Sequence, residues 1–167
     1  MKKGFLKFKL IIIIFSLIII SKPESYAQEM PVPANLQAAL FQKIFTFDKT
    51  LTAKGNIEVA VIGNSSDEIV AAFKAVGINT KTVNGEQVPA GVAAVYIMPG
   101  ITSTKQQTAS NGILSISGFP SYAEEGNVAI GIGVEGGKPK IIVNLKQLKA
   151  EGQDLSADLL KIAKVIQ

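Results

Sequence analysis

The chain has 167 residues, with 17 lysines, 13 acidic residues, no arginine, no cysteine and no histidine. Without arginine it lacks the bidentate donors that read phosphates and guanine edges, so we expect no nucleic acid partner. Without cysteine and histidine it has no disulfide, no thiol nucleophile, no usual general base and no common metal ligand, so we predict no catalytic residues, no metal and no cofactor.

The first 27 residues have the layout of a secretory signal peptide. The lysine-rich stretch Lys2–Lys9 precedes an apolar run, Leu10–Ile20. Ser25 and Ala27 then place small residues at the −3 and −1 positions of a cut after Ala27. The apolar run has eleven residues, whereas a membrane-spanning helix needs about 20. We therefore expect an exported protein, with a retained N-terminal anchor as the alternative.

Cleavage after Ala27 changes the charge of the chain. The removed segment holds five of the 17 lysines and one of the 13 acidic residues, so the mature chain has twelve of each. The formal net charge of +4 is therefore a property of the leader. The remaining residues suffice for one ordinary domain with its own core.

Apolar periodicity predicts the elements of this domain in chain order. Residues 28–33 are expected to be a flexible leader. A helix follows from Ala34, with an inward stripe made of Leu36, Ala39, Leu40, Ile44 and Phe47 and widened by Phe41 and Phe45. The next elements are a strand over 57–62, a helix starting at Ser65 and ending before Gly77, a polar edge strand over 78–83 and a buried strand over 92–98. A short helix over 103–110, a strand over 113–117 and a turn through 119–124 follow. The chain then forms a hairpin of 127–134 with 140–145, a helix over 146–150, and a last helix from Ser156 that carries Leu159, Leu160, Ala163 and Ile166.

Alternating strands and helices followed by a hairpin predict the fold class. We expect one α/β domain over residues 34–167, with a mostly parallel sheet, an antiparallel C-terminal hairpin edge and helices on both faces.

A small-ligand pocket is predicted where the first strand passes into its helix. Backbone N–H groups and the side chains of Asn64, Ser65 and Ser66 are suited to a small anion, with Ser117 at a neighbouring strand end. The alternative is that Ser65 only caps the helix, in a capping box with Glu68. The segment Gly131–Gly136 spells G-x-G-x-x-G, but it lies in a strand and a hairpin turn. We therefore expect these glycines to admit a close neighbour rather than a nucleotide.

Two groups of aromatic residues are candidate docking surfaces. Phe119, Pro120 and Tyr122 lie in a loop, where either partner binding or packing would account for them. Phe41, Phe45 and Phe47 lie on the first helix, where the apolar spread is too wide for a single contact face, and core packing is the favoured interpretation there.

A resemblance to a known family is carried by Ile113–Ser117, Phe119–Gly126, Ile141–Leu145, Gly152, Leu155–Ser156 and Leu159–Ala163. Through these residues the chain resembles the YfiR-like family of exported bacterial proteins, most specifically over residues 113–166. Leu40–Phe47 and Ile62–Gly63 fit more loosely. Four features depart from the family pattern: Gly118 replaces a strand-end aspartate, Gly126-Asn127 replaces a double glycine, a tryptophan–proline pair is missing near Leu51, and the disulfide cysteines are absent.

The resemblance implies a non-enzymatic periplasmic regulator. Such a protein binds the periplasmic part of an inner-membrane signalling protein, a diguanylate cyclase of cyclic-di-GMP signalling or a sensor histidine kinase, and modulates or represses its output. A homodimer is a further expectation. The alternative function is a periplasmic small-ligand binding module, and a hydrolase is the third.

Overall fold

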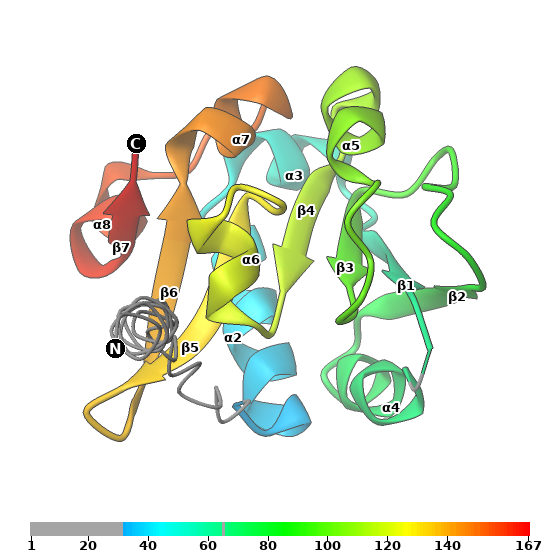
Figure 1. Cartoon of the computed structure of the whole chain (residues 1–167), viewed down its shortest axis with the longest axis horizontal. Helices are drawn as coiled ribbons and strands as arrows, with labels where there is room; N and C mark the ends of the chain where they lie inside the picture. Colours follow the sequence, from blue (N-terminus) through cyan, green and yellow to red (C-terminus); the bar gives the residue numbers. More distant parts are fainter. Residues whose placement is uncertain (1–31, 65) are drawn as a thin grey trace, which may run out of the picture.

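The computed structural model describes residues 32–64 and 66–167, which form one seven-stranded sheet with helices around it (Figure 1). The predicted signal peptide, most of the predicted leader and Ser65 lie outside the described residues. The elements in chain order are α2 (Ala34–Thr46), α3 (Lys49–Lys54), β1 (Glu58–Ile62), α4 (Asp67–Ala75), β2 (Asn79–Val83), β3 (Ala94–Ile97), α5 (Lys105–Asn111), β4 (Leu114–Ser117), α6 (Pro120–Glu124), β5 (Ile130–Glu135), β6 (Lys138–Asn144), α7 (Leu145–Ala150), α8 (Ala157–Ile162) and β7 (Lys164–Ile166).

The sheet confirms the predicted α/β class. Its strand order is β2-β1-β3-β4-β5-β6-β7, and every neighbouring pair is parallel except β5 with β6. The polar strand predicted at an edge is β2, at one end of the sheet. The apolar run over 92–98, predicted as a buried strand, contains β3, whose four residues are all buried, so both faces of the strand are covered.

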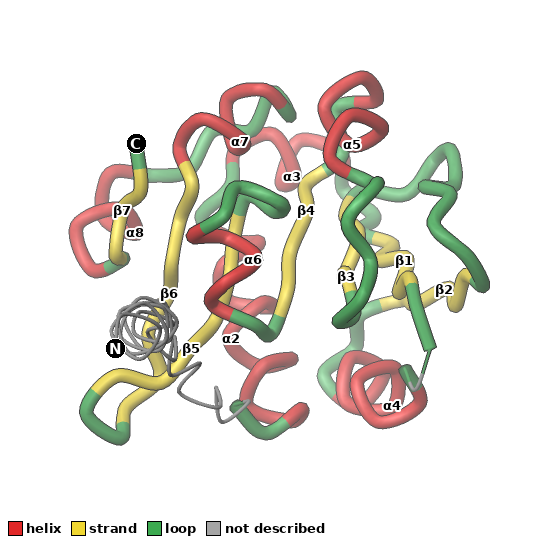
Figure 2. Tube along the Cα trace, in the orientation of Figure 1, coloured by secondary structure: helices red, strands yellow, loops and turns green. Residues whose placement is uncertain are grey.

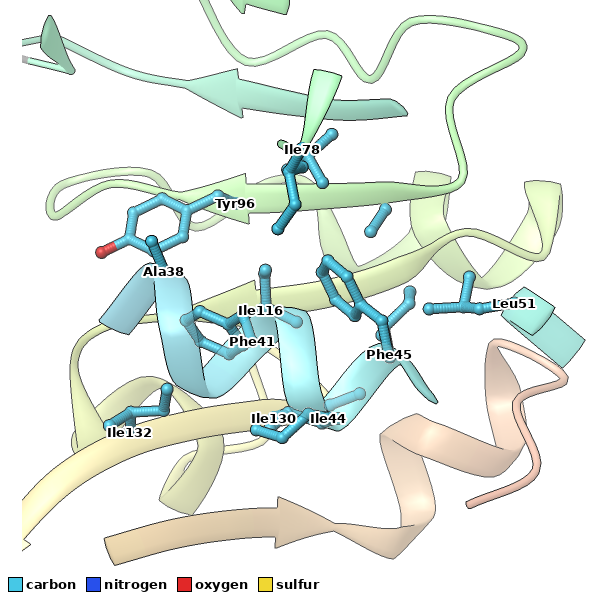
Figure 3. Packing of buried hydrophobic residues seen from close by; sticks show 14 of the residues in the cluster. Ala38, Phe41, Ile44, Phe45, Leu51, Ile78, Tyr96, Ile116, Ile130 and Ile132 are labelled. Carbon is cyan, nitrogen blue, oxygen red and sulfur yellow. The ribbon is translucent and has the colours of Figure 1, made fainter. Parts of the chain in front are cut away.

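Two apolar layers cover the two faces of the sheet. Core residues of α2, α4 and α8 pack on one face, and Ala123 of α6 joins the apolar layer on the other. Figure 2 shows α2 and α6 on opposite sides of the sheet. Figure 3 shows Phe41, Ile44 and Phe45 of α2 directed at the sheet. The rings of Phe41 and Tyr96 meet edge to face with centroids 6.1 Å apart, a favourable aromatic geometry.

The inward face of α2 differs from the predicted stripe. The buried residues are Gln37, Ala38, Phe41, Ile44 and Phe45, whereas Leu36, predicted to point inward, is 38% exposed. The helix turns this way because burying two phenylalanine rings removes more apolar surface from water than burying one leucine. Phe41 and Phe45 are therefore core residues, as the packing interpretation predicted.

The C-terminal end also differs from the prediction. The last helix ends at Ile162, and Lys164–Ile166 form β7, which pairs in parallel with β6. Ala163 and Ile166 were predicted to continue the helix. The open backbone edge of β6 offers a hydrogen-bonding partner that helical periodicity in the sequence does not reveal, and β-branched Val165 and Ile166 suit a strand.

Glycines in β5 allow α6 to lie directly on the sheet. A Cβ atom at Gly131 would lie 2.9 Å from Cβ of Ala123, and one at Gly133 would overlap the ring of Pro120. The G-x-G-x-x-G segment thus admits a close neighbour, as expected from its position. Its last glycine, Gly136, has a φ of 57° in the hairpin turn.

A buried carboxylate joins the end of α7 to β4. Glu151 is fully buried and accepts hydrogen bonds from the Ser115 backbone N–H at 2.9 Å, the Ser115 hydroxyl at 2.5 Å and the Gln147 side-chain amide at 2.8 Å. The Ser115 hydroxyl accepts in turn from the Ala129 backbone N–H at 2.8 Å. Burial raises the pKa of the Glu151 carboxyl against the opposing effect of these donors.

The raised pKa of Glu151 predicts a pH-dependent contribution to stability. The folded chain binds this proton more tightly than the unfolded chain, whose glutamate pKa is about 4.3. The stabilisation of the folded state by this bound proton is complete below that value and is lost as the pH rises through the folded pKa. Relative to Glu151→Gln, the wild-type chain should therefore lose free energy of unfolding as the pH rises above the unfolded value of about 4.3, measured by urea denaturation. Glu68→Gln, which changes an exposed carboxylate, is the matched control. A wild-type advantage that grows with pH would contradict this account.

Candidate functional site

The carboxyl ends of the central parallel strands meet at one edge of the sheet. Ile62 of β1 pairs with Ile97 of β3, and Tyr96 pairs with Ile116 of β4. Gly63 follows β1 with a φ of 116°, and a Cβ atom there would lie 2.7 Å from Cβ of Met98. Open α/β sheets bind ligands outside this edge, which makes it the candidate site.

A pocket of about 210 Å³ opens at this edge, between the starts of α2 and α4. Its walls are mostly apolar, with the amide of Gln37, the hydroxyl of Tyr96 and the carboxylate of Glu68 as polar groups. The lining residues are Val32, Pro33, Ala34, Gln37, Glu68, Ile69, Tyr96, Met98 and Phe119.

Three of the predicted ligand residues, Asn64, Ser66 and Ser117, do not line this pocket, and the fourth, Ser65, lies outside the described residues. Asn64 is exposed, and Ser66 is buried at the N-terminus of α4 without a side-chain capping bond. Ser117 is buried, donates to the Ile97 carbonyl at 2.9 Å and accepts from the Phe119 N–H at 3.3 Å. The hydroxyl of Ser117 therefore holds the strand end and the following loop together.

A buried polar cluster forms the floor of the pocket. The Tyr96 hydroxyl donates to the Gln37 side-chain carbonyl at 2.7 Å and accepts from the Gly118 N–H at 3.1 Å. The Gln37 amide donates to the Val32 carbonyl at 2.5 Å. Burial raises the pKa of Tyr96 to about 12, so its hydroxyl keeps its proton at neutral pH.

Glycine at position 118 is required by this cluster. A Cβ atom there would overlap the Gln37 side-chain carbonyl and would lie 2.5 Å from the Tyr96 hydroxyl. Gln37 therefore fills the space that a side chain at position 118 would take, the position where the family pattern has an aspartate.

The predicted docking residues lie beside the pocket at the start of α6. Phe119, Pro120 and Tyr122 are all half-buried, and the rings of Phe119 and Tyr122 lie 6.4 Å apart. The Tyr122 hydroxyl accepts from the Gly100 N–H at 2.7 Å. Pro120 packs inward against Gly133, which leaves Phe119 and Tyr122 as a pair of accessible rings, the aromatic surface.

Sequence reasoning missed Gln37, Tyr96 and Glu68 as pocket residues. Gln37 and Tyr96 are polar side chains within apolar runs, which is the signal that could have marked them. Their pairing was not accessible, because the two residues are 59 positions apart in the chain.

Comparison with solved structures supports the fold. Among them is the ABC domain in complex with L-Trp from Streptococcus pneumonia, with a TM-score of 0.56 and 15% sequence identity. The match covers 80% of this chain and 60% of that chain, so the chain spans less than two thirds of it. At this identity the likeness shows the fold alone. None of the curated proteins compared with the chain matches it.

Comparison with protein families gives a specific result. The sequence model of the YfiR/HmsC-like family matches residues 34–164, from the first residue of α2 to the first residue of β7. The match includes the pocket floor, the aromatic surface and the hairpin. The chain therefore belongs to the YfiR/HmsC-like family.

Proposed function

We propose that the protein is a non-enzymatic periplasmic regulator that binds the periplasmic part of an inner-membrane signalling protein and represses its output. The observation that carries the proposal is the YfiR/HmsC-like family match over residues 34–164, because this family indicates periplasmic regulators of cyclic-di-GMP signalling. The partner in this proposal is a diguanylate cyclase or a sensor histidine kinase.

Export is part of the proposal. The basic and apolar start of the chain directs it through the inner membrane, and cleavage after Ala27 releases a mature chain with no net formal charge. Within residues 32–64 and 66–167, no helix combines the length and apolar character needed to span a bilayer.

The aromatic surface is the proposed contact. Aromatic side chains at the centre of an interface contribute large binding energies, and Phe119 and Tyr122 keep part of their rings accessible in the free chain. The hydroxyl bond to Gly100 and the packing of Pro120 on Gly133 hold both rings in place before binding. Such preorganisation lowers the entropic cost of docking.

Replacing Phe119 by Ala should weaken docking far more than it weakens the fold. We expect at least tenfold lower affinity, as for an interface hot spot. The free energy of unfolding should fall by only about 1–2 kcal/mol, because the ring is half-buried and a fully buried phenylalanine costs about 3–5 kcal/mol. Capture of the inner-membrane sensor from detergent-solubilised membranes, with urea denaturation in parallel, measures both quantities.

Ile162→Ala is the matched control for this experiment. Ile162 is 69% exposed on α8, a helix that packs on the opposite face of the sheet from α6. Its replacement should leave sensor capture unchanged. Equal capture by Phe119→Ala and the wild-type chain, or capture of no sensor by the wild-type chain, would refute the proposed docking role.

The second candidate function is small-ligand binding in the pocket at the strand ends. The pocket lies where open α/β sheets hold ligands, and the similar fold from Streptococcus pneumonia was solved in complex with L-Trp. Glu68, the one charged residue among the lining residues, has no ion pair among the described residues. An apolar pocket with one free carboxylate favours a small apolar molecule that carries an amine.

L-Trp is the first probe for this second function. If it binds, it should raise the Tm in a concentration-dependent way, because a ligand of the folded state stabilises that state. Glu68→Gln should reduce the shift, since the amine would lose its ionic partner, while Glu86→Gln should leave it unchanged. A Tm that stays constant up to millimolar L-Trp would count against an aromatic amino acid as the ligand.

A further inference from the structure

The helix that carries the aromatic surface is held in place by its neighbours. α6 has five residues, and a helix of this length has no stability of its own in water. Tyr122 bonds to Gly100, and Glu124 pairs with Lys164 of β7 at 2.5 Å. Both side chains of this ion pair are partly exposed to solvent, so the pair contributes little to the stability of α6.

One buried side chain connects α6 to the rest of the fold. Asn144 is the last residue of β6 and is 7% exposed. Its side-chain carbonyl accepts from the Gln147 N–H at 3.0 Å and caps α7, while its side-chain NH₂ donates to the Ala123 carbonyl of α6 at 3.0 Å. A Cβ atom on Gly126, just after α6, would lie 3.3 Å from the same NH₂ group. The Asn144 side chain thus contacts the C-terminal end of α6 and the residue Gly126 that follows it.

Asn144 is itself fixed through α7. The Gln147 side chain donates to the Glu151 carboxylate at 2.8 Å and to the Lys105 carbonyl of α5 at 3.3 Å. Glu151 is tied to β4 through Ser115. A continuous chain of buried hydrogen bonds therefore runs from the centre of the sheet to α6, and buried polar networks of this kind rigidify the groups they connect.

We propose that Asn144 is the positioning residue that sets α6, and with it Phe119 and Tyr122, on the sheet. The chemistry requires an amide, because one side chain must accept from Gln147 and donate to Ala123. Aspartate keeps the acceptor and loses the donor, and serine keeps a capping hydroxyl that is too short to reach Ala123. Only the consequence for docking rests on the proposed function.

Two variants test the positioning role by amide hydrogen exchange of the free chain. Asn144→Asp and Asn144→Ser both preserve the α7 cap and remove the bond to the Ala123 carbonyl. The amides of Glu125, Gly126 and Asn127, which bond to α6 carbonyls, should exchange about tenfold faster, the effect of losing one hydrogen bond at a buried group. The amides of β3 should keep their wild-type rates. Asn144→Ser covers the case in which the buried charge of aspartate unfolds the chain.

Ser156→Ala is the matched control, because it removes a helix cap, that of α8, without touching α6. It should leave the α6 amides at wild-type rates. Unchanged α6 exchange in Asn144→Ser, or equal acceleration in α6 and β3, would overturn the inference. Faster α6 exchange with unchanged sensor capture would uphold the inference and overturn the docking role of the aromatic surface.

Discussion

The close contact between α6 and β5 is the constraint on which the candidate surface depends. Gly131 and Gly133 place no side chain between β5 and α6, so Ala123 and Pro120 approach the strand backbone at these two positions. Any side chain at Gly133 would overlap Pro120 and push the helix outward. Because Phe119 and Tyr122 flank that proline, the same displacement would move both rings. Two glycines in a strand thus determine where an aromatic surface stands.

The two ends of this surface are fixed by different physical means. At the pocket side, Gln37 and Tyr96 fill the space beside Gly118, and the Tyr96 hydroxyl donates to Gln37 and accepts from the Gly118 N–H. At the opposite side, Asn144 bonds to the last turn of α6. Both sets of hydrogen bonds are buried. Breaking one of them would leave a polar group unpaired away from water, so the folded state strongly favours keeping each bond. The surface between them consists of half-buried apolar rings that a partner can complete.

Much of the fold could be predicted from the sequence, because continuous apolar runs identify buried strands well. Val92–Met98 is such a run, and it contains the central strand β3. The failures occurred where a tertiary partner decides the outcome. α2 turned to bury Phe41 and Phe45 rather than Leu36, and Val165 joined the open edge of β6 rather than extending a helix. α3 was missed although Asp48 accepts from the backbone N–H groups of Thr50 and Leu51, a capping signal present in the sequence.

The candidate site was only partly predictable, for a related reason. Phe119 and Tyr122 are neighbours in sequence, and their adjacency in space follows from one turn of helix. The pocket floor joins residues from α2, β3 and the loop after β4, and no local pattern indicates such a meeting. The serine at position 117 was predicted to face a ligand because it ends a strand. Its hydroxyl instead bonds to backbone groups on both sides.

The central claim is that the start of α6 contacts an inner-membrane signalling protein, and site-specific photocrosslinking in intact cells tests it most directly. A benzophenone side chain is placed at position 119 of the exported chain in one strain and at position 162, on α8, in another. The account predicts an adduct with an inner-membrane sensor from position 119 and none from position 162. An adduct with that sensor from position 162 alone, or from neither position, would contradict it.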